Sequence, residues 1–372
     1  MICKLNLQNF RIFDGVDLTF DDSLSVIFKG GNGEGKTSLL ESIYFLATLR
    51  SFRTQKIQEM RKMGTSFFRV EGKIEKRKNF YYTLEARGVD KSSPDGSFPV
   101  FSKELYMDRM PVNRASDFTG RLPIVAFLPE DPEIITGSSL VRRRFFDMFC
   151  ASIDREYMGI LQSYSQALRS RNFLLKKGKT DPGILSSYHI ILARTGCQIL
   201  EKRRKYCILL EEKAREVLKE IRKELSDFTI SCRIRKESAD EAAYRQKLEQ
   251  DLAKDLQKGY TAFGPHLDDF ELSANGKSLK NYASRGQLRM CSFAIKMGLY
   301  SLLSSVNGLD EGKKVICLVD DVLGDLDSAA KESFFSRISG KGQIFYTFTE
   351  IPEDRNLAES QIFSVEKGKV CF

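Results

Sequence analysis

The alternation of apolar and polar positions predicts β-strands toward both ends of the chain. Residues 2–7 and 16–20 alternate, and the short apolar run at 24–28 predicts a buried strand. Residues 67–74 and 80–86 alternate around a polar turn, which predicts a hairpin. The remaining strand signals are 123–128, 314–319, 343–346 and the hairpin turn Asn275-Gly276.

The middle of the chain has helical periodicity instead. We expect one helix at 139–177, a second at 184–225 and a third at 240–258. Gly178 and the pair Asp181-Pro182 separate the first two. Two long helices joined by a short link predict an antiparallel helical arm.

This order of elements predicts an α/β fold in which the two ends of the chain form one domain. We expect residues 1–129 and 260–372 to form that domain and residues 130–259 to form the inserted arm. Residues 88–99 hold Pro, Gly, Ser and Asp, which predicts a surface loop.

Composition adds three limits. The chain has 372 residues and 42% hydrophobic content, as in a globular protein with two or three domains. No apolar run reaches membrane-spanning length, and the N-terminus has early charge and alternating polarity, unlike a secretory signal. The eight cysteines contain no C-x-x-C pair, which favours free thiols in the cytoplasm over zinc or disulfides.

The formal charge of +9 favours a polyanionic partner such as nucleic acid. Basic clusters lie at 142–144, 169–179 and 202–205, without matching acids nearby in the sequence. Two interpretations of these clusters stay open: contact with nucleic-acid phosphates, or an ordinary solvated helix surface.

Residues 30–37, GGNGEGKT, fit the phosphate-binding loop pattern between a predicted strand and a helix at 37–49. Its glycines allow successive N–H groups to point at one phosphate, and the helix start adds its positive dipole end. Lys36 is expected to reach the β- and γ-phosphates, and the Thr37 hydroxyl to bind Mg²⁺. The alternative is a glycine turn before a helix. The candidate nucleotide-binding residues are Gly30, Gly31, Asn32, Gly33, Glu34, Gly35, Lys36 and Thr37.

Residues 315–321, VICLVDD, are an apolar strand that ends in two acids, which is the Walker B pattern. Asp320 is expected to hold Mg²⁺, and Asp321 to orient or deprotonate the attacking water, so Asp321 and Lys36 are the catalytic candidates. Leu326-Asp327 matches the D-loop of ABC-type ATPases. A strand followed by a surface turn is the alternative.

Ser284-Arg285-Gly286-Gln287 opens an apolar helix at 288–306 and matches the ABC signature, Ser-x-Gly-Gln. In that class Ser284, Gly286 and Gln287 would bind the γ-phosphate of ATP held by the opposite protomer, which implies an ATP-dependent homodimer. A capped helix start is the alternative. Lys36 and Asp320 lie 284 positions apart. In a transporter subunit the two motifs lie much closer together, and in a chromosome-maintenance protein a coiled coil separates them by hundreds more residues. The intermediate separation predicts an ABC-type P-loop ATPase head with a short helical arm.

Across its whole length the chain resembles the RecF family of bacterial recombination mediators. The matching segments are Leu7-Gln8-Asn9-Phe10-Arg11, GGNGEGKT, Arg50-Ser51-Phe52-Arg53-Thr54, Phe127-Leu128-Pro129-Glu130-Asp131, Arg142-Arg143-Arg144-Phe145-Phe146-Asp147, Gly264-Pro265-His266-Leu267-Asp268-Asp269, Ser284-Arg285-Gly286-Gln287 and DDVLGDLD at 320–327.

The resemblance implies a cytoplasmic DNA-binding protein that uses ATP and Mg²⁺ and dimerises with ATP. It also implies slow, DNA-stimulated ATP hydrolysis, binding at DNA gaps and junctions, and loading of RecA together with RecR and RecO, in support of repair, replication and the SOS response. Whether single-stranded, duplex or gapped DNA is preferred stays open. The alternatives are a transporter's nucleotide-binding subunit and a scaffold that binds ATP without hydrolysing it.

Several positions depart from the family pattern: Gly31, Asp108, Leu267 and Arg285 stand where Glu, Asn, a basic residue and Gln are usual. No switch histidine follows the Walker B strand, and Thr347 and Thr349 stand there instead, as in the family. Of the two histidines, His189 is expected to be structural and His266 has no assigned chemistry. Arg11 is a candidate to approach the nucleotide.

Overall fold

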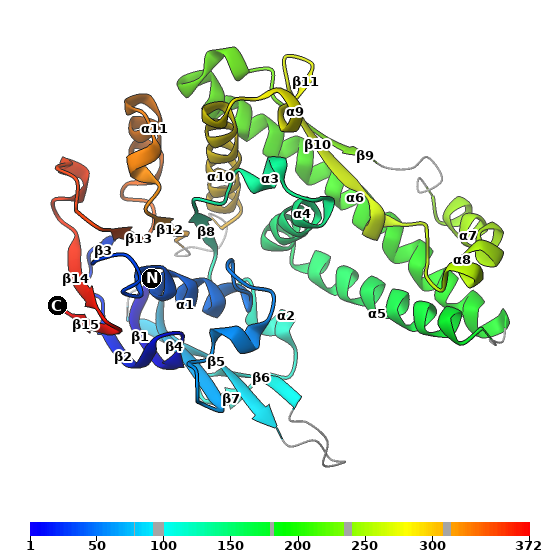
Figure 1. The fold of residues 1–372 in the computed structure, drawn as a ribbon, viewed down its shortest axis with the longest axis horizontal. Helices are drawn as coiled ribbons and strands as arrows, with labels where there is room; N and C mark the ends of the chain where they lie inside the picture. Colours follow the sequence, from blue (N-terminus) through cyan, green and yellow to red (C-terminus); the bar gives the residue numbers. More distant parts are fainter. Residues whose placement is uncertain (78, 92–99, 179–181, 234–239, 308–313) are drawn as a thin grey trace. The chain divides into compact units, whose positions relative to one another are not determined.

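The computed structural model describes residues 1–77, 79–91, 100–178, 182–233, 240–307 and 314–372. It contains two compact units (Figure 1). Unit 1 comprises Met1–Glu130 together with Leu303–Phe372, and unit 2 comprises Asp131–Leu302. Each unit is described by itself.

A mainly parallel sheet in unit 1 joins the two ends of the chain. The strand order is β15-β14-β3-β13-β12-β8, and only β15 runs antiparallel to its neighbour. The central strands β12 and β13 are buried at every position, because apolar side chains cover both faces. The strands are β3 (Ser25–Lys29), β8 (Ile124–Phe127), β12 (Ile316–Asp320), β13 (Ile344–Phe348), β14 (Gln361–Glu366) and β15 (Lys369–Cys371).

A second sheet in unit 1 is antiparallel, with the order β2-β1-β4-β5-β6-β7. Helix α1 (Lys36–Thr48) packs against strands of both sheets and is buried along most of its length, so it forms the centre of the core. The other elements of unit 1 are β1 (Ile2–Phe10), β2 (Phe13–Thr19), η1 (Ile57–Met60), β4 (Phe67–Arg77), β5 (Phe80–Lys91), β6 (Val100–Met107), β7 (Met110–Pro111), α2 (Ala115–Phe118), η5 (Leu323–Asp325), α11 (Ser328–Ile338) and η6 (Arg355–Leu357).

Unit 2 is mostly helical, with a small sheet in the order β11-β10-β9. Its elements are α3 (Glu133–Thr136), α4 (Ser139–Ile153), α5 (Arg155–Lys177), α6 (Pro182–Ile221), η2 (Lys223–Leu225), β9 (Thr229–Arg233), α7 (Glu241–Gln250), α8 (Leu252–Lys258), η4 (Pro265–Leu267), β10 (Asp269–Ala274), β11 (Lys277–Ser278), α9 (Leu279–Tyr282) and α10 (Arg285–Asn307), whose last residues belong to unit 1.

Three predicted elements differ from the structure. The single helix expected at 139–177 is two helices, because Asp154 leaves the helical conformation and caps α5 by accepting a hydrogen bond from the Glu156 N–H at 2.9 Å. The helix expected at 240–258 is likewise two, α7 and α8. The surface loop expected at 88–99 begins later, since β5 continues to Lys91, and residues 92–99 lie outside the described residues.

The first boundary between the compact units, after Glu130, is one residue from the expected one, whereas unit 2 continues past the expected boundary at 259–260 as far as Leu302. Residues 260–302 lie in unit 2, because β10 pairs with β9 and Phe146 of α4 stacks on Phe270 of β10 with ring centroids 3.9 Å apart. The division into a functional ATPase head and an arm stays a prediction.

The sequence suggested that the basic clusters lack acidic partners, but in the structure two of their arginines form ion pairs with aspartates. Arg142 pairs with Asp269 at 2.7 Å, and Arg203 pairs with Asp147 at 2.8 Å. These arginines are almost fully buried, and their partners come from distant parts of the chain. The buried, paired guanidinium groups of Arg142 and Arg203 therefore fit neither of the two open interpretations, phosphate contact or a solvated surface.

Candidate functional site

The loop at 30–35 connects β3 to α1 and requires glycine at specific positions. A Cβ on Gly30 would lie 2.2 Å from the carbonyl oxygen of Val365. Gly35 has φ +113°, and its Cβ would lie 2.7 Å from the Phe13 ring. Gly33 has φ +81°, in the left-handed region. The loop is thus a tight backbone cradle whose shape requires glycine at positions 30, 33 and 35.

Gly31 is different, because neither its backbone conformation nor its surroundings require glycine. Its backbone has no positive φ, and a Cβ there would meet nothing nearer than the Glu34 Cγ at 3.5 Å. The Glu34 carboxylate accepts a hydrogen bond from the Lys367 N–H, and Asn32 Oδ1 accepts one from the Thr349 hydroxyl at 3.5 Å. These bonds join the loop to the C-terminal strands.

Lys36 begins α1 and points its ammonium group back into the loop. Its Nζ donates to the carbonyl oxygens of Gly30 and Gly31, both at 2.7 Å, and the residue is buried. A cation inside a ring of backbone groups at a helix N-terminus gives this loop the positive potential that phosphate groups require.

Asp320 ends the buried strand β12 beside the start of α1. Its Oδ1 accepts hydrogen bonds from the Thr37 hydroxyl at 2.9 Å and from the Thr347 hydroxyl at 2.7 Å. The two halves of the predicted site, 283 positions apart in the sequence, therefore meet in unit 1. Thr347 is a member of this site that the sequence analysis noted only as the residue near the place of a switch histidine.

Burial raises the pKa of the Asp320 carboxyl above its usual range, hydrogen bonds from Thr347 and Thr37 lower it, and the nearby carboxylates of Glu130 and Asp321 raise it again. Glu130 follows β8, and its approach to Asp320 was missed because nothing in the local sequence relates the two. An all-oxygen group of a carboxylate and a hydroxyl beside further carboxylates fits Mg²⁺, which prefers such ligands and would relieve their repulsion.

Asp321 is the first residue after β12 and does not continue the extended backbone of the strand. It is exposed and has φ +53°, a left-handed conformation that is uncommon for a residue other than glycine. The backbone turns directly after Asp320, so the two neighbouring carboxylates have different environments, one buried and one in solvent.

The predicted signature residues belong to unit 2 and form a reciprocal cap on α10. The Ser284 N–H donates to Gln287 Oε1 at 2.9 Å, and the Gln287 N–H donates to the Ser284 hydroxyl at 3.2 Å. Ser284 and Gly286 are exposed, and a Cβ on Gly286 would lie 4.0 Å from the Ser284 hydroxyl, its nearest neighbour. This is an open, polar helix N-terminus.

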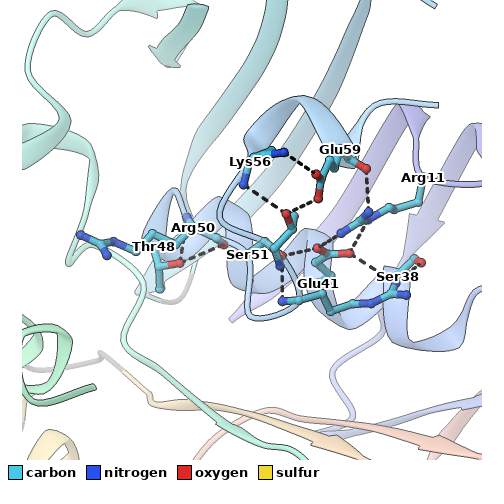
Figure 2. A network of polar contacts seen from close by, with 10 residues as sticks. Arg11, Ser38, Glu41, Thr48, Arg50, Ser51, Lys56 and Glu59 are labelled. Atoms are coloured by element: carbon cyan, nitrogen blue, oxygen red, sulfur yellow. Dashed lines mark hydrogen bonds and ion pairs between the residues drawn. The ribbon is translucent and has the colours of Figure 1, made fainter. Parts of the chain in front are cut away.

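Glu41 lies on the same helix as Thr37 and is the centre of a polar network (Figure 2). Its role was not predicted from the sequence. Glu41 is fully buried, and Arg11, Ser51 and Arg53 converge on its carboxylate. Arg53 also donates to the Ser38 hydroxyl at 3.4 Å, next to Thr37. A carboxylate among the apolar residues of a buried helix was the available signal. Arg11, expected near the nucleotide, bonds to Glu41 and to the Glu59 carbonyl.

Neither histidine is placed for chemistry. His266 Nε2 donates to the Thr261 carbonyl at 3.0 Å and Nδ1 accepts from the Tyr164 hydroxyl at 2.7 Å, and burial lowers its pKa. Burial lowers the pKa of His189 to about 4. Within the described residues, no group of three or more His, Cys, Asp or Glu side chains is arranged to hold a metal ion.

Comparison with known proteins identifies the family. Residues 4–260 match a family described as an AAA domain. A protein of Oceanobacillus iheyensis named DNA replication and repair protein RecF is 32% identical, with 99% of each chain covered. The chain belongs to the RecF family. A protein of the same name from Bacillus cereus strain B4264 is 30% identical, over 99% of this chain and 98% of the relative.

Solved structures agree with this assignment. One described as the recombination mediator protein RecF-ATP in the RecFOR pathway has a TM-score of 0.84 and 26% identity, and covers 100% of this chain and 96% of its own. The Smc head domain of Pyrococcus furiosus, at 15% identity and a TM-score of 0.52, shares the fold. The predicted RecF resemblance and the predicted α/β, ABC-type P-loop ATPase fold are confirmed. Among the described residues, no helix has the length and apolar character needed to cross a membrane.

Proposed function

We propose that this RecF-family chain is an ATP-dependent DNA-binding switch of DNA repair and replication. The observation that carries the proposal is the meeting of Thr37 with Asp320 at 2.9 Å beside the buried Lys36, on a glycine cradle of phosphate-binding geometry. The relatives' name, DNA replication and repair protein RecF, and the ATP in the description of a similar structure support it.

In this proposal ATP binds along the loop at 30–37, with Lys36 at its β- and γ-phosphates. Thr37 and Asp320 would hold Mg²⁺, which neutralises phosphate charge when bound. Asp321, exposed beside them, would orient the attacking water. Ser284, Gly286 and Gln287 would bind the γ-phosphate held by a second copy, so that ATP closes a homodimer and slow hydrolysis opens it.

The closed dimer would bind DNA, with gapped DNA as the expected preference, and cooperate with RecO and RecR to load the RecA recombinase, in support of the SOS response and in the cytoplasm. The net charge of +9 and the RecFOR pathway in the description of a similar structure support these partners.

Fluorescence anisotropy of labelled gapped, duplex and single-stranded DNA tests the switch. The parent and Lys36→Met are compared with ATP and Mg²⁺, with ADP, and without nucleotide. Binding that requires ATP and is lost in Lys36→Met is the expected result. DNA binding independent of nucleotide would separate the loop from the DNA surface and overturn the coupling.

Hydrolysis needs its own experiment, because a scaffold that binds ATP would also pass a nucleotide-binding test. We expect Asp321→Asn to bind ATP like the parent and to lose most of its DNA-stimulated turnover. Equal turnover in the variant and the parent would remove Asp321 from the catalytic role. The transporter alternative receives no support from the family assignment.

A further inference from the structure

Helix α5 ends beside α8 in unit 2 (Figure 1). Exposed apolar and basic side chains belong to this end of the two helices. Phe173 is 57% exposed, Tyr260 47% and Leu256 38%, and all three belong to the end of α5 or to α8 and the residues just after it. Exposed lysines surround them. We call this the tip patch, and it consists of Phe173, Lys176, Lys177, Leu256, Lys258 and Tyr260.

A buried polar staple holds the two sides of the tip patch in place. Arg171 donates to Asp255 at 2.8 Å and to the Thr261 hydroxyl at 2.6 Å, and both members of the ion pair are fully buried. Asn172 Oδ1 accepts from the Thr261 N–H at 2.8 Å and from its hydroxyl at 2.7 Å. Phe173 follows Asn172 and Tyr260 precedes Thr261, so these bonds join the two chain segments that carry the exposed rings.

Two of the three lysines, Lys177 and Lys258, are placed against the rings rather than against acids. Lys177 Nζ lies 4.4 Å from the centroid of the Phe173 ring, and Lys258 Nζ lies 5.9 Å from that of Tyr260. In the part of the chain that the structure describes, Lys176, Lys177 and Lys258 make no ion pair with a carboxylate. This contrasts with Arg142, Arg171 and Arg203 of the basic clusters, whose charges are neutralised internally.

Cations at helix C-termini complement the helix dipole, and that accounts for lysines at the ends of α5 and α8. It does not account for two exposed aromatic rings beside them. A single strand offers the flat faces of its unpaired bases for stacking and its backbone phosphates for ammonium groups. It therefore matches both the rings and the lysines of the tip patch. A duplex hides its base faces, and an acidic protein surface would use the lysines while leaving the rings without a specific partner.

We propose that the tip patch binds single-stranded nucleic acid, with Phe173 and Tyr260 stacking on unpaired bases and the lysines contacting adjacent phosphates. This extends the proposed DNA-binding function by giving the protein a surface that recognises the unpaired segment of a gapped substrate.

The test compares binding of fluorescein-labelled oligo-dT and of a duplex by the full chain with ATP and Mg²⁺. The double variant Phe173→Ser/Tyr260→Ser is expected to bind oligo-dT about fivefold more weakly or worse, while its duplex affinity and ATP turnover stay those of the parent. Phe173→Tyr/Tyr260→Phe is expected to retain affinity because it keeps both rings. Phe80→Ser, which removes a ring 60% exposed in unit 1, is the matched control and is expected to change nothing.

The charge part of the inference has a separate readout. Lys176→Gln/Lys258→Gln is expected to reduce the salt dependence of oligo-dT binding, whereas the ring variant leaves that dependence unchanged because it removes no charge.

Unchanged oligo-dT binding in the ring variant overturns the inference. Equal losses on oligo-dT and on duplex also overturn it, since base stacking cannot explain them. Intact DNA binding with lost binding of purified RecR or RecO would assign the tip patch to a protein partner instead. ATP-dependent duplex binding by a parent that ignores oligo-dT would overturn the tip patch alone, whereas no binding to any DNA would overturn the proposed function.

Discussion

Arg11 holds the fully buried Glu41 with two parallel hydrogen bonds, from Nε to Oε2 at 2.7 Å and from Nη2 to Oε1 at 2.5 Å. Arg11 itself has φ +54° and donates its backbone N–H to the Met60 carbonyl at 2.7 Å. The turn between β1 and β2 is thereby fixed to the middle of the P-loop helix. Removing one member of a buried ion pair leaves the other charge uncompensated, so the arrangement depends on both Arg11 and Glu41.

Replacing Glu41 by glutamine tests this dependence. Glu41→Gln leaves the guanidinium of Arg11, whose side chain is only 16% exposed, without its counter-charge. We expect the free energy of unfolding to fall by about 2–4 kcal/mol, measured by urea denaturation. Glu216→Gln is the matched control because Glu216 pairs with Lys213 on an exposed helix surface, and we expect a change below about 0.5 kcal/mol there. Equal effects of the two substitutions would contradict the account.

Thr347→Val removes one of the two hydroxyls that hold the Asp320 carboxylate. Asp320 Oδ1 then keeps the bond from Thr37 but loses the one from Thr347, so the carboxylate is less well oriented. We expect the Mg²⁺ concentration for half-maximal ATP turnover to rise about three- to tenfold, equivalent to one lost hydrogen bond. Titration of turnover with Mg²⁺ at saturating ATP measures it.

Thr349→Val provides the control for this prediction. It makes the same chemical change two residues further on, where the hydroxyl makes only a 3.5 Å contact to Asn32. Its Mg²⁺ requirement is expected to match the parent's. A Thr347→Val variant with an unchanged Mg²⁺ requirement would exclude Thr347 from positioning Asp320.

The P-loop and the Walker B strand follow from local patterns, because each depends on residues adjacent in the sequence. The arrangement within unit 2 does not. Arg142 meets Asp269 across 127 positions, and Arg171 meets Asp255 across 84. These arginines appeared unpaired because only acids close to them in the sequence were considered as partners. The break at Asp154 was missed for a different reason, since apolar spacing continues through it although its backbone leaves the helical conformation after α4 and its carboxylate caps α5.

Gly264 shows a second kind of long-range dependence. It has φ +134°, and a Cβ there would lie 2.3 Å from the Tyr244 hydroxyl and 2.4 Å from that of Tyr164. Gly264→Ala must displace both tyrosines and strain the backbone, so we expect it to lower the free energy of unfolding by about 3 kcal/mol. Gly276→Ala has φ +67° and open space around the new Cβ, so it isolates the backbone term at about 1 kcal/mol. Thermal unfolding of the pair measures the difference, and equal losses would show that the tyrosines yield freely.

Asp320→Asn is expected to stabilise the protein without nucleotide while abolishing Mg²⁺-dependent turnover. Burial raises the pKa of the Asp320 carboxyl, so the folded state binds its proton more readily than the unfolded state does. The free energy of unfolding therefore falls as pH rises from about 4, the ordinary aspartate value, through the raised pKa, and the full penalty is present at neutral pH. Asparagine carries no charge and escapes that penalty, which gives an expected gain of about 0.5–2 kcal/mol at pH 7.

The pH dependence makes this prediction specific. Melting temperatures from pH 8 down to about 4 are expected to show the Asp320→Asn advantage shrinking toward the acid end, where the folded parent's carboxyl is protonated and that of the unfolded state is becoming so. Asp22→Asn, at an exposed position, is expected to show no such trend. Adding ATP and Mg²⁺ is expected to reverse the order, because binding to the folded state stabilises the parent and not the variant. An advantage that is constant with pH would mean that the gain does not come from the buried charge.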